Sequence, residues 1–315
     1  MDKEIKTICG DAIEEMKKLP DKSIHLIVTD PPYNLNKDYG NNQDKLKFEK
    51  YLDFSRQWLT ETKRILTDNG TIYVFMGMRY ISYVYTILEK ELGMTFNSWI
   101  TWFYTQGIGK TKGFSPRHDD ILMFTKSPQK FVFHLDDIRV PQKFYRSVNN
   151  MRGANPGNVW EFSHMHYCNE NRKQHTTQKP EGLFARMILA SSNPGDTILD
   201  PFVGSGTTLR VCQQTDRNGL GIDINPEYIE MTRERLAEEF KGFDSIDERM
   251  KRVPNDLNDA AIREEYIRNH VEWFLKNHPD AVGEFMQEVS QKYEVKMKES
   301  NQMALFGIEL AAATV

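Results

Sequence analysis

The stretch Ser23-Ile-His-Leu-Ile-Val-Thr-Asp-Pro-Pro-Tyr33 decides the fold. Its first half is a nearly continuous apolar run, which is typical of a parallel strand buried on both faces. The run stops at Asp30, and Pro31 and Pro32 block its continuation because proline has a fixed φ and no backbone N–H. Open α/β sheets bind ligands at the carboxyl ends of their strands. An acid, two exposed carbonyls and the Tyr33 ring therefore indicate a site, although Pro-Pro is equally common in plain turns.

Length and composition fit a globular enzyme. The 315 residues are 39% hydrophobic and 27% charged, enough for an α/β core with an added segment, and we expect one large domain with insertions. The charged start Met1 to Lys6 and the lack of long apolar runs predict neither signal peptide nor membrane span. Cys9, Cys168 and Cys212 are few and scattered. They argue against a disulfide scaffold and favour a reducing cytoplasm.

Strands and helices alternate along the chain. Besides the strand before Asp30, strands are predicted at residues 5–9, 71–76, 97–104, 121–125, 130–134, 197–200 and 218–223, with 121–125 and 130–134 as a pair. Helices are predicted at residues 12–19, 49–66, 80–92, 183–191, 209–215 and 228–240. Residues 34–47 are polar and predict a mobile loop beside the site. The fold class is therefore α/β, a doubly wound, mostly parallel sheet with helices on both faces.

Basic residues accumulate between Phe103 and Pro180, where periodicity fades. This segment carries a formal charge of +6 in a chain of −4, with aromatic residues interleaved. Such asymmetry suits a surface that meets a polyanion. A merely solvated insertion explains the charges too.

A second signal is the strand, glycine bend and helix that contain Asp200-Pro-Phe-Val-Gly-Ser-Gly-Thr-Thr208. Glycines let the backbone approach a ligand, and the helix N-terminus behind them favours an anionic group. A further strand ends at Asp223, which is placed to accept hydrogen bonds from ribose hydroxyls. The pattern indicates an adenosine-containing ligand. An NAD enzyme is one interpretation, but the third fingerprint glycine is replaced by Leu209, whereas S-adenosylmethionine meets the requirements without it.

Asp30-Pro-Pro-Tyr33 followed by the glycine bend resembles the amino-methyltransferases of DNA. The order resembles their beta group, in which the catalytic tetrapeptide comes first, a target-recognition segment next and the cofactor glycines last. His175-Thr-Thr-Gln-Lys-Pro180 is similar to the cofactor motif that precedes the glycines in this family, and departs from it at Thr176, where proline is more usual. The resemblance covers about residues 5–240. It implies a Rossmann-like methyltransferase fold, S-adenosylmethionine as cofactor and double-stranded DNA as substrate.

The resemblance implies an enzyme that transfers a methyl group to the N6 amine of a flipped-out adenine. Asp30 and the Pro31 carbonyl would each accept one amine N–H, and Tyr33 would stack on the base. Cytosine-N4 methylation shares this geometry, and Asp in place of Ser at position 30 favours adenine. A DNA-binding protein that has lost turnover is a third interpretation, against which the intact Asp30 and glycine bend argue.

The candidate site residues divide by role. Catalytic residues are Asp30, Pro31, Pro32 and Tyr33. Cofactor-binding residues are Asp11, Gln178, Lys179, Asp200, Phe202, Gly204, Ser205, Gly206, Thr207, Thr208 and Asp223. We expect no metal: His164, His166, Cys168 and His175 could form a zinc site, but their spacing fits a strand face, nucleic-acid contact or packing better.

The sequence predicts four regions along the chain: a catalytic half at 1–105, a target-recognition segment at 106–174, a cofactor-binding half at 175–240 and a helical extension at 241–315. In the second region, the side chains expected to read base edges are those of Asn149, Asn150, Arg152 and Asn155. Phosphate contact or a structural turn explains these four residues equally well.

In the helical extension, the sequence pattern predicts amphipathic helices at 256–277 and 281–298, and we expect them to pack on the core or on DNA. Beyond them, Gln302-Met-Ala-Leu-Phe306 resembles the peptides by which bacterial proteins bind the replication sliding clamp. The alternative is that Leu305 and Phe306 anchor the C-terminus. Resemblance also implies a homodimer, a cognate restriction endonuclease as partner, and a cytoplasmic, nucleoid-associated location.

Overall fold

The computed structural model describes residues 3–34, 46–104, 109–140, 153–162, 178–240 and 242–243. The chain divides into two compact units, one of residues 1–139 and 155–248 and the other of residues 140–154 and 249–315. Nearly all described residues belong to the first unit, and the four predicted regions remain a proposal. The expected tail helices and the Gln302–Phe306 peptide lie outside the described residues.

One sheet organises the first unit, with the strand order β1-β8-β7-β2-β3-β5-β4-β6 in the described part of the chain. The strands are β1 Ile5–Cys9, β2 Ile24–Thr29, β3 Leu66–Met76, β4 Thr95–Phe103, β5 His118–Thr125, β6 Val159–Glu161, β7 Thr197–Asp200 and β8 Asn218–Asp223. Neighbours from β1 to β3 pair in parallel. β5 runs antiparallel between β3 and β4, and β6 is parallel to β4. The predicted mostly parallel α/β sheet is confirmed.

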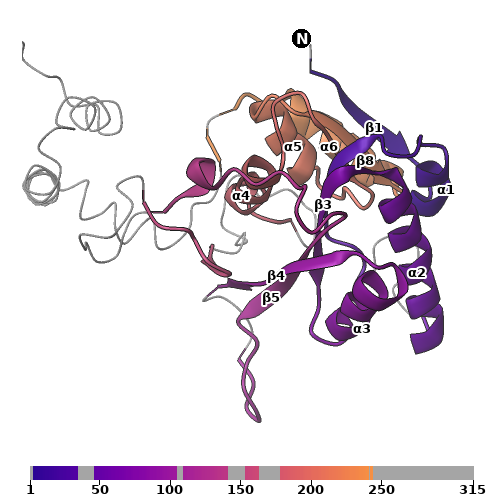
Figure 1. Ribbon diagram of the computed structural model, residues 1–315, viewed down its shortest axis with the longest axis vertical. Helices are drawn as coiled ribbons and strands as arrows, with labels where there is room; N and C mark the ends of the chain where they lie inside the picture. The colour runs from indigo at the N-terminus through magenta and orange to yellow at the C-terminus, as the bar shows by residue number, and fades with distance from the viewer. Residues whose placement is uncertain are drawn as a thin grey trace, which may run out of the picture. The chain divides into compact units, whose positions relative to one another are not determined.

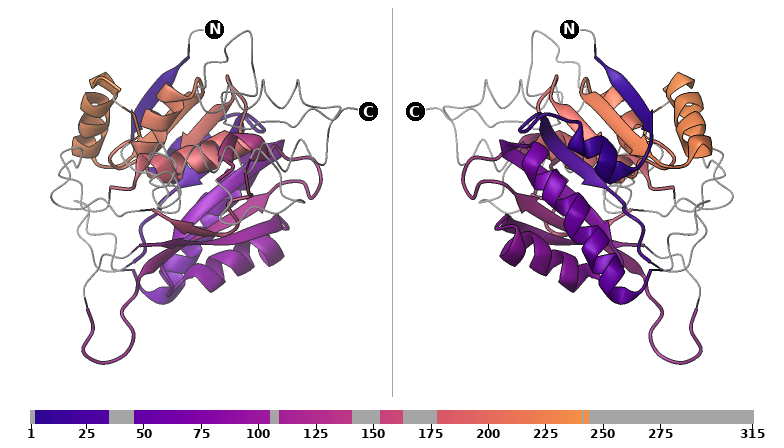
Figure 2. Two further views of the ribbon diagram at one scale, coloured as in Figure 1. Left: turned by 90° about the vertical axis from the view of Figure 1, so that its left-hand side faces the viewer. Right: turned by 90° about the vertical axis from the view of Figure 1, so that its right-hand side faces the viewer.

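Helices cover both faces of the sheet (Figures 1 and 2). Those described are α1 Ala12–Lys17, α2 Phe48–Ile65, α3 Ile81–Thr86, α4 Glu181–Ser191, α5 Thr207–Gln214 and α6 Pro226–Ala237. Along β3, Ile72 and Val74 join the core under α1, α2 and α3, whereas Tyr73 and Phe75 join the core under α4 and α5. Successive strand residues point to opposite faces, so a strand with helices on both sides must be apolar throughout. This is why the central strands appear in the sequence as continuous apolar runs.

Strand direction places the carboxyl ends of seven described strands at one edge of the sheet. β1, β2, β3, β7 and β8 run in one direction. β4 shares this direction because both β3 and β4 are antiparallel to β5, and β6 shares it because it is parallel to β4. We call the edge where these seven strands end the carboxyl edge. Ligand sites of such sheets lie there.

Two expectations for individual elements were wrong. Residues 130–134 are not a strand: β5 pairs with β3 and β4 instead, and the His134 N–H donates to the Ala190 carbonyl at the end of α4 (2.7 Å). β3 begins at Leu66, directly after α2, and not at residue 71 as expected, with a register shift against β2 before Thr71. The expected helix 80–92 is present: α3 continues into a π-helical turn, Ile87–Glu91.

None of the described helices combines the length and apolar composition needed to cross a membrane.

Candidate active site

Asp30 lies at the carboxyl edge, directly after β2, with 19% of its side chain exposed. One carboxylate oxygen accepts a hydrogen bond from the Tyr33 hydroxyl, and the other binds the Lys179 ammonium group. Asp30 and Lys179 are 149 residues apart in the sequence. The structure thus brings together the predicted catalytic tetrapeptide and the predicted cofactor motif.

Lys179 is a buried cation with 8% of its side chain exposed. Its Nζ lies 5.7 Å from the centre of the Tyr33 ring and 5.5 Å from that of Phe75, which is on β3. A buried ammonium group needs compensation, which Asp30 supplies as counter-ion and the two ring faces supply through their negative potential. The sequence assigned Lys179 to the cofactor, and its contact with Asp30 was not foreseen.

The two proline carbonyls differ in their surroundings. The Pro32 oxygen accepts a hydrogen bond from the Tyr51 hydroxyl of α2 (2.7 Å). No donor from the described residues takes the Pro31 oxygen. The Tyr33 ring lies against Gly77, where an added Cβ would come within 3.3 Å of the ring. Pro31 is buried, and Tyr51 fixes the loop through the carbonyl of the next residue, Pro32.

Asn34 is a positioning residue that the sequence analysis missed. It adopts a left-handed conformation (φ 56°), which asparagine tolerates better than most residues. Its side-chain amide donates to the Leu46 carbonyl and to the Tyr80 hydroxyl, both at 2.9 Å, and its oxygen accepts from the Leu46 N–H at 2.8 Å. Asn34 thus ties together the two ends of the expected mobile loop, whose residues 35–45 lie outside the described ones.

The glycine bend between β7 and α5 packs tightly on α6. Gly206 precedes α5 with φ 77°, and a Cβ there would lie 2.7 Å from the Thr232 methyl group. The Thr232 hydroxyl donates to the Gly204 carbonyl (2.9 Å). Glycine is therefore needed at 206 for backbone conformation and for packing on α6, in addition to any approach of a ligand.

Asp223 ends β8 and holds the same bend. Its carboxylate oxygens accept hydrogen bonds from the N–H groups of Gly204 (3.0 Å) and Asn225 (2.9 Å). Burial raises the pKa of the Asp223 carboxyl, and these backbone hydrogen bonds oppose the shift. A carboxylate offers about four acceptor sites, and backbone donors occupy three of them, those of Asn225, Gly204 and Ile224, so capacity remains for a ligand hydroxyl.

Asp200 points into the interior of the protein. Its carboxylate accepts hydrogen bonds from the hydroxyls of Thr208 (2.5 Å) and Thr29 (3.0 Å) and from the Phe202 N–H (3.1 Å). Burial raises the pKa of Asp200 to about 7, although these donors lower it. Its observed contacts shape the bend, and its expected cofactor contact stays a prediction.

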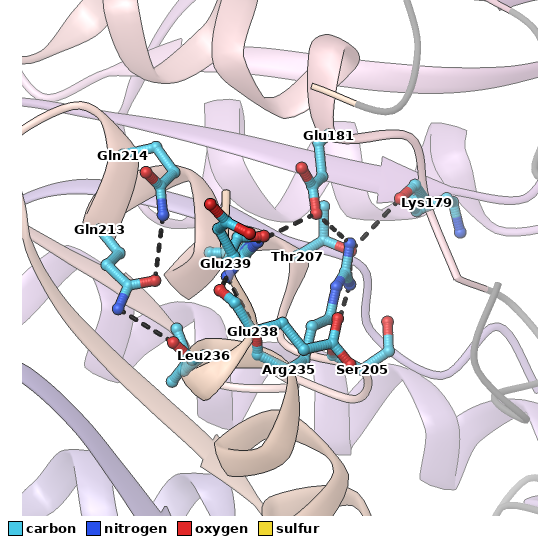
Figure 3. A network of polar contacts seen from close by, with 11 residues as sticks. Lys179, Glu181, Ser205, Thr207, Gln213, Gln214, Arg235, Leu236, Glu238 and Glu239 are labelled. Carbon is cyan, nitrogen blue, oxygen red and sulfur yellow. Dashed lines mark hydrogen bonds and ion pairs between the residues drawn. The ribbon is translucent and has the colours of Figure 1, made fainter. Parts of the chain in front are cut away.

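A buried polar network holds the Lys179 segment against the glycine bend (Figure 3). The Arg235 guanidinium of α6 donates to the Ser205 carbonyl (3.0 Å), the Thr207 hydroxyl (3.0 Å) and the Glu181 carboxylate (2.5 Å). The Thr207 hydroxyl donates in turn to the Lys179 carbonyl (3.3 Å). The hydroxyl groups of Thr207 and Thr208 are thus occupied inside the protein.

The remaining candidate residues are dispersed. Asp11 caps α1 by accepting from the N–H groups of Ile13 (3.0 Å) and Glu14 (3.1 Å). Asn155 accepts from the Gly157 N–H (2.8 Å), as in a structural turn.

Gln178 is buried, and Phe202 is half-buried, with its ring near those of Phe54 and Trp58. The residues outside the described ranges are Asn149, Asn150, Arg152, His164, His166, Cys168 and His175. The described residues hold no cluster that could bind a metal ion.

Sequence comparison identifies the family. The DNA methylase profile matches residues 24–234. The chain belongs to the DNA methylase family. It is 68% identical over 298 residues to the type II methyltransferase M.HpaI of Haemophilus parainfluenzae, covering 95% of each chain. It is 37% identical to the DNA adenine methyltransferase YhdJ of Escherichia coli K12, covering 74% of this chain and 83% of that one.

Solved structures agree with this assignment. The complex of M1.HpyAVI with S-adenosylmethionine superposes with a TM-score of 0.53 at 27% identity, covering 74% of this chain and all of that one. PvuII DNA methyltransferase, described as cytosine-N4-specific, superposes with a TM-score of 0.63 at 18% identity, which shows the shared fold alone. This DNA methylase is a Rossmann-like DNA methyltransferase that uses S-adenosylmethionine.

Asp200→Asn should change the pH dependence of stability. The raised pKa of Asp200 means that the folded state binds the proton of this carboxyl more tightly than the unfolded state does. The protonated carboxyl therefore contributes stability that is complete below about pH 4 and is lost as the pH rises through 7. The asparagine variant lacks this loss. Between pH 5 and 7 its free energy of unfolding should gain up to about 1.4 kcal/mol per pH unit relative to wild type, as measured by denaturant titration.

The exposed Asp68→Asn variant serves as control and should differ from wild type by a constant amount over pH 5 to 8. A constant difference for Asp200→Asn over the same range would contradict the assignment.

Proposed function

We propose that this DNA methylase transfers the methyl group to the N6 amine of adenine in a flipped-out base. The observation that carries the proposal is the half-buried Asp30 carboxylate at the carboxyl edge, followed directly by a Pro31 carbonyl that accepts no hydrogen bond from the described residues. Asp rather than Ser at position 30 supports adenine over cytosine, as does the similarity to YhdJ, a DNA adenine methyltransferase.

Asp30 and Pro31 supply two hydrogen-bond acceptors for an amine that has two N–H groups. Each carboxylate oxygen of Asp30 already has one donor, Tyr33 or Lys179, and can accept a second. Two acceptors draw the amine nitrogen from planar towards tetrahedral geometry, so its lone pair becomes available for attack. The positive charge that develops on nitrogen is stabilised by a carboxylate that is already held in place.

Lys179 is proposed to orient Asp30. Its positive charge opposes the charge that develops on the amine, so electrostatic stabilisation of the transition state is not its contribution. Lys179 acts by positioning, because an ammonium group buried against Tyr33 and Phe75 holds the Asp30 carboxylate in one orientation. The ring faces share the ammonium charge and leave part of the Asp30 charge for the amine.

The cofactor site is proposed at the glycine bend and Asp223. S-adenosylmethionine supplies an electrophilic methyl group on its sulfonium when it is bound. Asp223 accepts hydrogen bonds from the ribose, and the half-buried Phe202 offers an apolar surface beside the bend. Asp30 and Asp223 end strands of one sheet at the same edge, so both ligands are held on a rigid scaffold.

The DNA side of the site is proposed at Tyr33 and within residues 106–174. A base inside a duplex cannot reach Asp30, so it is extruded and stacks on the Tyr33 ring. The recognition sequence is proposed to be read by residues 106–174. The type II description of M.HpaI supports a restriction endonuclease as cognate partner. Homodimer formation and sliding-clamp binding through residues 302–306 remain predictions from resemblance, as does association with the nucleoid.

Nucleoside analysis tests the base assignment. Unmethylated DNA is incubated with the protein and cofactor labelled in its methyl group, then digested to nucleosides and separated. We expect the label in N6-methyldeoxyadenosine. Label in N4-methyldeoxycytidine would establish the alternative base, and no label in DNA under conditions where the cofactor binds would favour the non-catalytic interpretation.

Asp30→Ala and Asp223→Ala should separate turnover from cofactor binding. Asp30→Ala should reduce the single-turnover rate by at least about 100-fold, the usual loss of a preorganised electrostatic contact, with cofactor Kd nearly unchanged. Asp223→Ala should weaken cofactor binding by about 1–3 kcal/mol, the usual cost of lost hydrogen bonds to a charged group. Calorimetric titration measures the binding.

Asp53→Ala, at an exposed acid within α2, is the matched control for both variants. The assignment fails if Asp30→Ala loses cofactor binding as severely as turnover, or if Asp223→Ala titrates like wild type.

A further inference from the structure

A basic loop with an aromatic side chain in full solvent contact connects β4 to β5. We call residues 109–117 the β4–β5 loop; they contain three basic residues and no acidic one. Lys110 and Lys112 are exposed, and the side chain of Phe114 is 100% exposed. The next most exposed large apolar side chains in the described part of the chain are Val159 at 58% and Met78 at 57%. Figures 1 and 2 show this connection projecting away from the sheet.

The loop leaves the sheet at the carboxyl edge, where the candidate active site lies. β4 runs in the same direction as β2 and β3, and β5 returns antiparallel, with Phe103 paired to His118 at the base of the loop. Met76, which ends β3, is paired with Asp120. The loop and the Asp30 tetrapeptide therefore project from the same edge, and β3 alone separates β2 from β5, the strand to which the loop returns.

The conformation of the loop is defined by hydrogen bonds within it. The Tyr104 N–H donates to the Arg117 carbonyl (2.9 Å), and the Lys110 N–H donates to the Ser115 hydroxyl (2.7 Å). Gly113 has φ 84°, a left-handed conformation that allows the chain to reverse next to Phe114. The tip is thus a shaped turn that presents Phe114 outward.

The acids at the base of the loop have other partners. Asp120 is buried and accepts hydrogen bonds from the Trp99 indole (3.0 Å) and the Thr101 hydroxyl (3.3 Å), while Asp119 bonds the Tyr104 hydroxyl. His118 lies 3.6 Å from Asp120. Lys110 and Lys112 form no ion pair with any described residue. The positive charge at the tip is therefore available to a polyanion.

A lone exposed apolar residue is ordinary on a protein surface, but this one combines three properties. It is fully solvated, it lies between cations, and it projects from the edge to which DNA must come. A flipped base leaves a gap in the duplex whose neighbouring base pairs have lost a stacking partner. Proteins that distort DNA insert apolar side chains between base steps, and aromatic rings stack on any base without sequence preference.

We propose that the β4–β5 loop contacts the DNA duplex, with Lys110 and Lys112 on phosphates and Phe114 inserted into the base stack beside the extruded base. The inserted ring stabilises the duplex in its base-extruded form, so it lowers the cost of bringing the target to Asp30. The proposal rests on the base extrusion of the proposed function.

The test uses a duplex of about 20 base pairs around a site that the wild-type protein methylates, with 2-aminopurine next to the target base. Phe114→Ala should reduce the fluorescence rise on binding and should lower kcat/KM about tenfold, which is the scale of one lost base–aromatic stack. Phe114→Tyr keeps the ring and should behave like wild type. Phe114 is fully exposed, so thermal melting of both variants should match wild type.

Phe133→Ala is the matched control, because Phe133 is 42% exposed and follows β5 at the opposite edge of the sheet. A second duplex carries a mismatch at the target base, which makes extrusion easier. There the Phe114→Ala defect should shrink to less than about threefold. Lys110→Gln with Lys112→Gln should weaken binding to all duplexes and reduce the slope of log Kd against log salt by about two.

The proposal is overturned if Phe114→Ala matches Phe133→Ala on the paired duplex, or if its defect is equally large on the mismatched one. Failure of the wild-type protein to raise the 2-aminopurine fluorescence while it methylates the duplex would instead contradict base extrusion itself.

Discussion

The contact between the Lys179 ammonium group and the Asp30 carboxylate joins the two halves of the active site. An ammonium group with 8% of its side chain exposed is costly to bury, so its position is confined to the place where a carboxylate and two ring faces compensate it. Asp30 is confined in turn, because Tyr33 and Lys179 occupy one oxygen each. The geometry of the Asp30 loop therefore depends on a residue from the segment that precedes α4.

The same residue is connected to the glycine bend through its backbone. The Lys179 carbonyl accepts the Thr207 hydroxyl, and Thr207 accepts from Arg235, which also pairs with Glu181 (Figure 3). Removing one partner from a buried ion pair leaves an uncompensated charge, so the Arg235–Glu181 pair holds the segment firmly. α6, the glycine bend and Asp30 thus form one connected structure.

Sequence patterns predicted the parts of this structure that local chemistry determines. The apolar run before Asp30, the glycines before α5 and the acid at the end of β8 each occupy the place expected, because strand periodicity, proline and glycine act over a few residues. The antiparallel insertion of β5 between β3 and β4 was missed. Nothing local distinguishes a strand that pairs with a distant strand from one that pairs with its neighbour.

The contacts between residues distant in the chain could not be predicted from the sequence either. Lys179 and Asp30 are 149 positions apart, and Asp200 and Thr29 are 171 apart. A motif predicts that Asp200 lies at the bend, but whether its carboxylate faces a ligand or the interior depends on hydroxyl groups from other elements. The side-chain direction is set by packing of the whole sheet.

Replacement of Lys179 tests the connection between the two halves most directly. Lys179→Met keeps length and apolar stem but removes the charge, and Lys179→Arg keeps the charge. The account predicts that Lys179→Met lowers the single-turnover methylation rate at least about tenfold while cofactor Kd changes less than about threefold, and that Lys179→Arg recovers part of the rate. Loss of cofactor binding as large as the loss of rate, or an unchanged rate in Lys179→Met, would contradict it.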